Sequence, residues 1–130
     1  MAPKAEPDPL RRRAERRGRW SESLAAWYLR AKLYRILARR YRTPVGEVDL
    51  IARRGRTIVF VEVKRRPTEA EAIEAVRPAA RRRIARAAEH WVAAHPAALG
   101  FDRRFDVIVA VPGRGLRHLQ AVFDVEGRPW

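Results

Sequence analysis

Residues 46–66, GEVDLIARRGRTIVFVEVKRR, decide the fold of this chain. Two segments rich in β-branched and aromatic residues, 46–52 and 57–64, flank a short connection that contains Gly55. A connection of this kind between two apolar segments predicts an antiparallel β-hairpin. Three charged residues within the two segments set this hairpin apart from an ordinary apolar one.

These charges are Asp49 in the first strand and Glu62 and Lys64 in the second. Alternate residues of a strand share a face, so Glu62 and Lys64 are neighbours on the face that also carries Phe60. A turn centred between residues 54 and 55 sets Asp49 opposite Phe60 and diagonal to Glu62, with the Cβ atoms about 7 Å apart. We therefore expect two carboxylates within reach of one cation.

Such a carboxylate pair predicts a divalent metal site. Two carboxylates in a partly buried site repel each other, and a cation bound between them relieves the repulsion. With Asp49, Glu62 and the Val63 carbonyl as ligands, Mg²⁺ or Mn²⁺ would polarise a phosphodiester and acidify a bound water. Lys64 would orient that water or offset the developing charge.

The same residues also fit a solvated cross-strand cluster of charges that contributes little to stability. Against that reading, the surrounding strand positions are almost all β-branched or aromatic. Lysine is also rare, because the 29 Lys and Arg residues include only Lys4, Lys32 and Lys64 as lysines. A water-orienting amine is available from lysine but hardly from arginine, which stays protonated. The pattern favours catalysis ahead of a charge cluster.

A helix is expected before the hairpin, from Gly18 onward. It carries Glu22 on one stripe with Ala25, Ala26 and Leu29, which directs the Glu22 carboxylate toward the body of the protein. Two roles stay open for Glu22. It completes the cation site, directly or through water, or it is an ordinary first-turn glutamate that the helix dipole favours.

Two segments flank the hairpin. Residues 34–42 form a short strand that ends at Thr43-Pro44. The polar residues 65–77 are interpreted as a flexible loop, with a turn of helix begun by Thr68 and a capping box completed by Glu71.

A second long helix and two strands complete the pattern. Pro78 suits the first turn of a helix that ends near His95, and strands follow at 104–111 and 116–125. The order helix, three strands, helix, two strands predicts an α/β fold with a mixed five-stranded sheet flanked by helices. We expect residues 1–17 to be a disordered basic tail and residues 18–130 to be a single domain.

The spacing of Asp49 and Glu62-Val63-Lys64, with the upstream Glu22, resembles the PD-(D/E)xK nuclease superfamily, which has a restriction-endonuclease-like core. The hairpin sequence itself resembles the YraN family of endonuclease-like proteins, which is similar to archaeal Holliday junction resolvases. The resemblance implies Mg²⁺- or Mn²⁺-dependent cleavage of phosphodiester bonds. It assigns the acidic positions to Glu22, Asp49 and Glu62 and the lysine to Lys64.

The chain departs from the superfamily pattern at three positions. Val48 replaces the proline before the aspartate, Leu33 replaces the glycine ahead of the first strand, and Ala80 replaces a lysine of the second helix. The first two changes affect shape, whereas the third removes a nucleic-acid contact that Arg81 to Arg83 would supply. Asp106 matches a later strand of the family, with its role left open.

The charge predicts nucleic acid as the partner. A net charge of +14 gives the molecule a strongly positive field. The sequence has no apolar run long enough to span a membrane, no signal segment and no cysteine, so we expect a soluble, cytoplasmic protein without disulfides or cysteine-ligated zinc. The residues expected to contact phosphates are Arg53, Arg54, Arg56, Arg65, Arg66, Arg81, Arg82 and Arg83.

Three functions are weighed from the sequence. The first is a resolvase-like nuclease that cuts structured or branched nucleic acid, with DNA favoured over RNA. The second is a nucleic-acid-binding protein that keeps the fold and does not cut, and the third is a ribosome-associated RNA-binding protein. Resolvase relatives act as two-fold dimers, which leaves a homodimer open.

Histidines and tryptophans are assigned to structure. The scattered histidines are expected on helix or strand surfaces: His90, His95 and His118. The helical tryptophans are expected to pack in the core: Trp20, Trp27 and Trp91.

Overall fold

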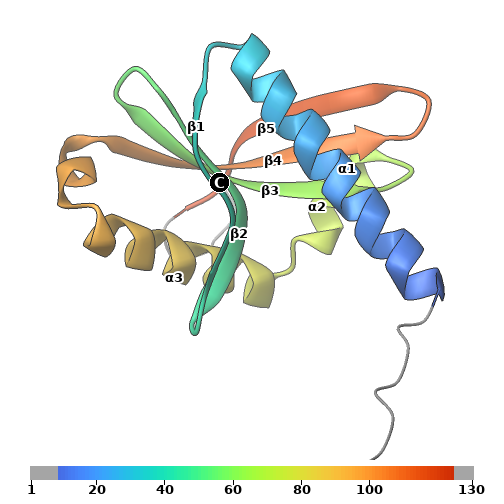
Figure 1. Ribbon diagram of the computed structural model, residues 1–130, viewed down its shortest axis with the longest axis horizontal. Helices are drawn as coiled ribbons and strands as arrows, with labels where there is room; N and C mark the ends of the chain where they lie inside the picture. Colours follow the sequence, from blue (N-terminus) through green and yellow to red (C-terminus); the bar gives the residue numbers. More distant parts are fainter. Residues whose placement is uncertain (1–8, 125–130) are drawn as a thin grey trace, which may run out of the picture.

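The computed structural model describes residues 9–124, with side chains described from Arg19 onward. Within this range the chain forms a five-stranded sheet and flanking helices (Figure 1). The elements in chain order are α1 Pro9–Ala31, β1 Arg35–Thr43, β2 Gly46–Arg54, β3 Thr57–Arg65, α2 Glu69–Ala75, α3 Pro78–Ala94, the 3₁₀ helix η1 Pro96–Gly100, β4 Asp102–Val111 and β5 Gly115–Phe123. The predicted α/β class is confirmed.

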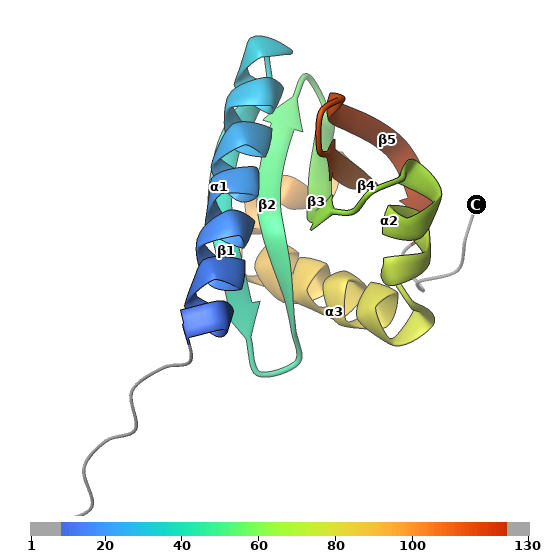
Figure 2. The ribbon, with the colours of Figure 1, turned by 90° about the vertical axis from the view of Figure 1, so that its right-hand side faces the viewer.

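The strands lie in the order β1-β2-β3-β4-β5. Neighbouring strands are antiparallel except for β3 and β4, which are parallel because α2 and α3 carry the chain back across the sheet. Helix α1 covers one face of the sheet, and α2 and α3 lie on the other side (Figure 2). The sheet is therefore mixed, and its layers are those of the restriction-endonuclease-like core that the resemblance implies.

Each face of the sheet has its own hydrophobic core. Small residues of α1, Ala25 and Ala26, let that helix approach the strands closely, and Leu29 fills the space beside them. On the other face, Phe60 packs against the ring of Trp91 from α3, so the predicted core position of Trp91 is confirmed. Burial of these two cores holds both helices against the sheet.

Helix α1 begins at Pro9, well before the expected start at Gly18. Proline suits the first helical turn because it has no N–H to leave unsatisfied, and the Leu, Arg, Ala and Glu residues that follow favour helix. Residues 9–17 of the expected disordered tail are therefore helical, and residues 1–8 lie outside the described residues. None of the helices in the described residues is long and apolar enough to cross a membrane.

The expected flexible loop at 65–77 is wrong in part, because residues 69–75 form α2. The predicted capping box is present: the Thr68 hydroxyl accepts a hydrogen bond from the Glu71 N–H, with 3.2 Å between Oγ1 and N. Ala72 is fully buried, so the short helix is docked on the body of the protein. A single buried alanine was too weak a signal in the sequence to predict this.

Gly46 fixes the distance between β2 and α3. A Cβ atom placed on Gly46 would lie 1.9 Å from the carbonyl oxygen of Arg83, which is closer than any real contact. The absence of a side chain therefore lets the start of β2 lie directly against the helix. This contact sets the position of the strand segment that leads into Asp49.

Candidate active site

The hairpin register differs from the predicted one. The last pair of β2 and β3 is Arg54 with Thr57, so the two-residue turn is centred between residues 55 and 56. Gly55 occupies the first turn position with φ of +60°, which glycine adopts without strain. Continuing the observed register by one residue beyond Leu50 and Val61 sets Asp49 directly opposite Glu62. The expected pairing of Asp49 with Phe60 is therefore wrong, because the turn lies one residue later.

Asp49 and Glu62 stand where the two strands part. Beyond them, residues 46–48 of β2 pair with β1, and residues 62–65 of β3 pair with β4. Figure 2 shows β2 and β3 diverging toward α3 and α2. We call this opening the fork. It places the carboxylates at the end of a rigid hairpin.

At the fork, the Asp49 side chain takes the place of a backbone hydrogen-bond acceptor. Its Oδ2 atom accepts a hydrogen bond from the Val63 N–H, with 2.8 Å between the two atoms. The N–H and C=O of one strand residue point to the same side, so the Val63 carbonyl also faces the fork. The carboxylate of Asp49 and the Val63 carbonyl are thus directed to the same opening.

Glu62 and Lys64 form an ion pair in the same place. The Lys64 Nζ atom lies 3.4 Å from Glu62 Oε1, and the Glu62 side chain is 15% exposed. Burial, followed by the charge of Asp49, raises the pKa of Glu62 to about 8, while Lys64 acts in the opposite direction. Near neutral pH the Glu62 carboxyl is therefore largely protonated. A cation bound to Glu62 would displace this proton.

Glu22 reaches the site from α1. The side chain is buried, and its Oε2 atom lies 3.2 Å from Arg40 Nε without accepting an aligned hydrogen bond from the described residues. Burial and then the charge of Asp49 raise the pKa of Glu22. Because α1 begins at Pro9, Glu22 lies several turns inside the helix, so it is not a first-turn glutamate.

Two neighbouring arginines of β1 both contact α1, which sequence reasoning missed. Arg40 pairs with Glu22, and the Arg39 guanidinium donates to the Ser23 hydroxyl with 2.9 Å between the atoms. Consecutive strand residues normally point to opposite faces, but Arg40 has a left-handed φ of 51° that breaks the alternation. A non-glycine residue in this conformation leaves no readable mark in the sequence.

The oxygen atoms at the fork fit a hard divalent cation. Carboxylate oxygens from Asp49 and Glu62 and the Val63 carbonyl are ligands that Mg²⁺ accepts, and it commonly uses one or two carboxylates and several waters. Within the described residues, no three Asp, Glu or His side chains converge closely enough to form a metal cluster by themselves. Water would therefore complete the coordination, with Glu22 near enough to Asp49 for their charges to interact.

The predicted phosphate-binding arginines divide into two groups. Arg53, Arg54 and Arg56 lie at the turn end of the hairpin, about 16 Å along β3 from Glu62. There Arg53 and Arg56 lie over the ring of Phe101, and Arg54 lies over Tyr34. The structure therefore does not bring this group to the fork.

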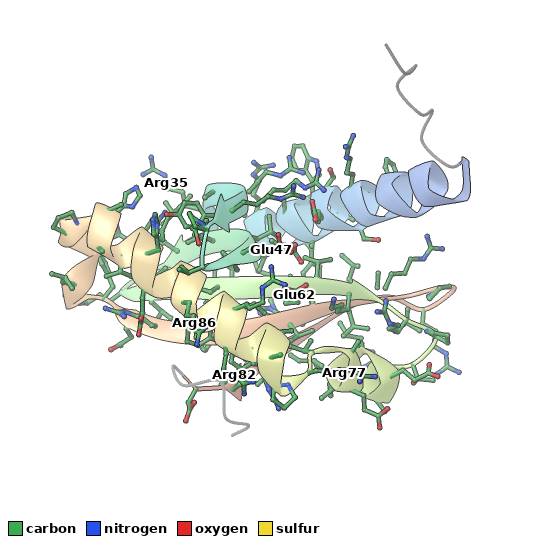
Figure 3. All side chains as sticks on the ribbon, turned by 90° about the horizontal axis from the view of Figure 1, so that it is seen from below. Arg35, Glu47, Glu62, Arg77, Arg82 and Arg86 are labelled. Carbon is green, nitrogen blue, oxygen red and sulfur yellow. The ribbon has the colours of Figure 1, made fainter. Side chains whose placement is uncertain are left out.

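The second group lies at the fork end. Arg65 and Arg66 directly follow Lys64 at the end of β3, and Arg81 to Arg83 are in the first turns of α3, next to Gly46. Arg82 points outward along α3 with Arg86 (Figure 3). Arg81, three residues before the buried Ile84, differs because it is on the inner side of the helix and its Nε atom is buried without a partner in the described residues.

Asp106 belongs to a separate buried network on the α1 side of the sheet. Its fully buried carboxylate accepts hydrogen bonds from Arg104, from the Ala121 N–H and from His118 Nε2, which lies 2.7 Å away. Burial by itself would raise the pKa of Asp106, but the hydrogen bonds from His118, Arg104 and Ala121 outweigh it and lower the pKa. Asp106 therefore positions β4, β5 and their neighbours.

His118 is buried in this network, so its expected surface position is wrong. Its side chain is 1% exposed, and its Nδ1 atom accepts a hydrogen bond from Lys32 Nζ at 3.0 Å. Lysine can only donate, so Nδ1 of His118 is the acceptor and carries no hydrogen. The ring hydrogen is therefore on Nε2 of His118, which donates to Asp106. No local sequence pattern indicates this network, because its members come from distant segments of the chain.

Comparisons with known proteins find relatives over most of the chain. The model of the uncharacterised protein family UPF0102 matches residues 21–110, which include Glu22, Asp49, Glu62 and Lys64. A UPF0102 protein of Methylorubrum extorquens is 47% identical over 127 residues, covering 98% of this chain and 99% of the relative. One from Bradyrhizobium diazoefficiens is 51% identical over 116 residues, covering 89% of this chain and 87% of the relative.

A third relative, a UPF0102 protein of Maricaulis maris, is 49% identical over 113 residues, covering 87% of this chain and 89% of the relative. The matches extend over both helix layers and the hairpin, so they include every residue of the fork. The chain belongs to the UPF0102 family, which is the YraN family that the hairpin sequence resembles.

Proposed function

We propose that the protein is a metal-dependent nuclease that hydrolyses phosphodiester bonds in structured or branched nucleic acid. One observation carries the proposal: the carboxyl groups of Asp49 and Glu62 are close enough to interact at the fork, with Lys64 Nζ 3.4 Å from Glu62. Two carboxylates and a lysine at the end of a rigid hairpin are a costly arrangement for a structural purpose, because the carboxylates repel. In a hydrolytic site, the two carboxylates and the lysine would each have a chemical role.

A divalent cation, Mg²⁺ or Mn²⁺, bound at Asp49, Glu62 and the Val63 carbonyl would supply Lewis acidity toward the phosphodiester and a water of lowered pKa. Glu62 loses its proton when it becomes a ligand. Asp49 keeps a fixed orientation through its hydrogen bond from Val63. The Lys64 ammonium lies beside the pair, where it orients water or offsets negative charge that develops on the phosphate.

Residues around the fork would bind and place the substrate. Arg81, which is partly exposed near the start of α3, would donate to a phosphate oxygen, and the exposed Arg82 would add longer-range attraction. Glu22, balanced by Arg40, would hold a water on the α1 side of the site. The preference for branched nucleic acid follows from the resemblance to resolvases.

The test is cleavage of a panel of labelled substrates, namely junctions, flaps, single strands and blunt duplexes of DNA and RNA, with Mg²⁺ and with Mn²⁺. We expect metal-dependent cleavage that Glu62→Gln reduces at least a hundredfold, because a metal ligand is lost. Glu47→Gln is the matched control, since Glu47 is an exposed glutamate of β2 that pairs with Arg42. No cleavage of any substrate, or equal cleavage by wild type and Glu62→Gln, would remove the basis of the proposal.

A second function, nucleic-acid binding without cleavage, is favoured by a different observation. Within the described residues no group of three acidic or histidine side chains is preassembled for metal, and Lys64 already pairs with Glu62. This alternative predicts binding that weakens with salt and is the same with EDTA, with Mg²⁺ and after Glu62→Gln.

A further inference from the structure

The outer side of α1 carries exposed aromatic residues. The side chains of Trp20 and Trp27 are 66% and 67% exposed, with Leu24 between them. These positions are separated by four and three residues, so they form one stripe in which the tryptophans lie about 10 Å apart along the helix axis. The expected core positions of both tryptophans are therefore wrong, because the helix buries its opposite side, Ala25, Ala26 and Leu29, against the sheet.

A groove of about 260 Å³ lies beside the Trp20 end of this stripe. Trp20 and Leu24 line one wall, the β4–β5 turn at Pro112 and Gly113 lines the other, and Arg65 lies at the inner end. Arg65 directly follows Lys64 on β3. The groove therefore connects the Trp20 end of the stripe with Arg65 at the end of β3.

The charges around the stripe indicate which kind of ligand would bind there. Residues 19–32 contain one acidic residue, Glu22, which is buried and faces the fork. The exposed charges of this segment are therefore all basic. The Arg30 guanidinium lies 5.0 Å from the centre of the Trp27 ring. Aromatic faces set among basic groups suit a ligand that combines flat rings with phosphates.

Other occupants fit the stripe less well. A second copy of the chain would bring together two molecules that each carry a net charge of +14, and their repulsion opposes association. In a duplex the base faces are stacked on one another and are not available to a tryptophan. Unpaired nucleotides offer both free base faces and phosphates.

We propose that the α1 stripe binds unpaired nucleotides of the substrate, with bases stacked on Trp20 and Trp27 and phosphates near Arg30 and Arg65. This inference rests on the proposed function and specifies it: the preferred substrate has a single-stranded segment beside the bond that is cut. The segment follows the groove from Trp20 toward Arg65 and the fork.

Binding in EDTA tests the inference without cleavage. The affinity of the full-length protein is measured for a fluorescent DNA duplex with a single-stranded tail and for a blunt duplex with the same number of phosphates. We expect wild type to prefer the tailed duplex, and Trp20→Ala/Trp27→Ala to lose roughly tenfold or more in affinity for it. Affinity for the blunt duplex stays the same, because its phosphate contacts are unchanged.

Two further variants separate stacking from a general loss of structure. Leu99→Ala is the matched control, because Leu99 on η1 is also 67% exposed and lies away from α1. Trp20→Phe/Trp27→Phe keeps two aromatic rings and is expected to retain part of the preference for the tail.

The outcomes distinguish the inference from the proposed function. Unchanged affinity in the double alanine variant, or an equal loss for both duplexes, overturns the inference. A concentration-dependent dimer that the double variant abolishes would assign the stripe to a second copy and also overturn it. Tail binding that depends on the tryptophans, without cleavage in Mg²⁺ or Mn²⁺, supports the inference and contradicts the nuclease proposal.

Discussion

The Asp49 carboxylate accepts a hydrogen bond from the Val63 N–H, with 2.8 Å between Oδ2 and N, at the point where β2 and β3 separate. One side chain thereby satisfies a backbone donor that the neighbouring strand no longer reaches. The same contact fixes the carboxylate opposite Glu62. Asp49 thus has a structural task and, in the proposed function, a metal-binding one, and the two tasks can be separated by mutation.

Asp49→Asn and Asp49→Ala are predicted to differ in stability. The asparagine oxygen still accepts a hydrogen bond from Val63, whereas alanine leaves that partly buried N–H unsatisfied. We expect Asp49→Ala to lose about 1–3 kcal/mol of unfolding free energy relative to Asp49→Asn. Urea unfolding monitored by circular dichroism measures the difference. Equal stability of the two variants would show that the hydrogen bond contributes nothing.

The metal-free protein is predicted to lose stability as the pH rises from 4.5 to about 8. The pKa of Glu62 is higher in the folded state, so between these values the folded protein binds more protons than the unfolded chain and stability falls with increasing pH. Glu62→Gln removes this dependence. At pH 9 in EDTA we expect the variant to be more stable than wild type by up to a few kcal/mol, since one pKa unit corresponds to about 1.4 kcal/mol.

The measurement is a series of urea unfolding curves from pH 4.5 to pH 9, with Glu47→Gln as the control. Glu47 is exposed, so its substitution should follow the wild-type curve. Parallel stability profiles for wild type and Glu62→Gln would be incompatible with a raised pKa of Glu62.

Asp106→Asn is predicted to destabilise the protein by about 3 kcal/mol at pH 7, because it leaves the Arg104 guanidinium without its buried counter-charge. The pKa of Asp106 is lowered in the folded state, so its stabilisation is present above the ordinary pKa and disappears as the pH falls below it. Asp102→Asn, at an exposed position in the same strand, should have little effect. Thermal unfolding of both variants at pH 7 and pH 3 gives the comparison.

Gly46→Ala is predicted to destabilise the fold by about 2 kcal/mol or more, because the new Cβ atom would overlap the Arg83 carbonyl and force β2 and α3 apart. The neighbouring residue Val45 is half exposed, so Val45→Ala is a suitable control with little expected effect. Chemical unfolding compares the two variants. A Gly46→Ala protein as stable as wild type would mean that α3 adjusts without cost.

The elements and the sheet were largely predictable because they depend on local patterns. The hairpin followed from two β-branched segments around Gly55, and α3 followed from Pro78 and an apolar stripe. The register required the turn type as well, since a shift of the turn centre by one residue moved the partner of Asp49 from Phe60 to Glu62.

The remaining features of the site depend on contacts between distant segments or on unusual backbone. Arg40 reaches Glu22 through a left-handed φ that no local pattern indicates. His118 and Asp106 lie on different strands, and their contact depends on how β4 and β5 pair. Helical spacing correctly placed the side of α1 with Ala25 and Leu29 toward the body of the protein. Trp20 and Trp27 were expected in the core because of their apolar character, but they lie on the opposite side of the helix.

Calorimetric titration with Mn²⁺ at pH 7 tests the central claim that Asp49 and Glu62 form a cation site. Wild type and Glu47→Gln are expected to bind Mn²⁺ and to release a proton, since the pKa of Glu62 is about 8 before binding. Repeating the titration in two buffers with different ionisation enthalpies measures that proton. Asp49→Asn and Glu62→Gln should each bind at least tenfold more weakly, and Glu62→Gln should bind without proton release. Identical binding isotherms for all four proteins would contradict the site.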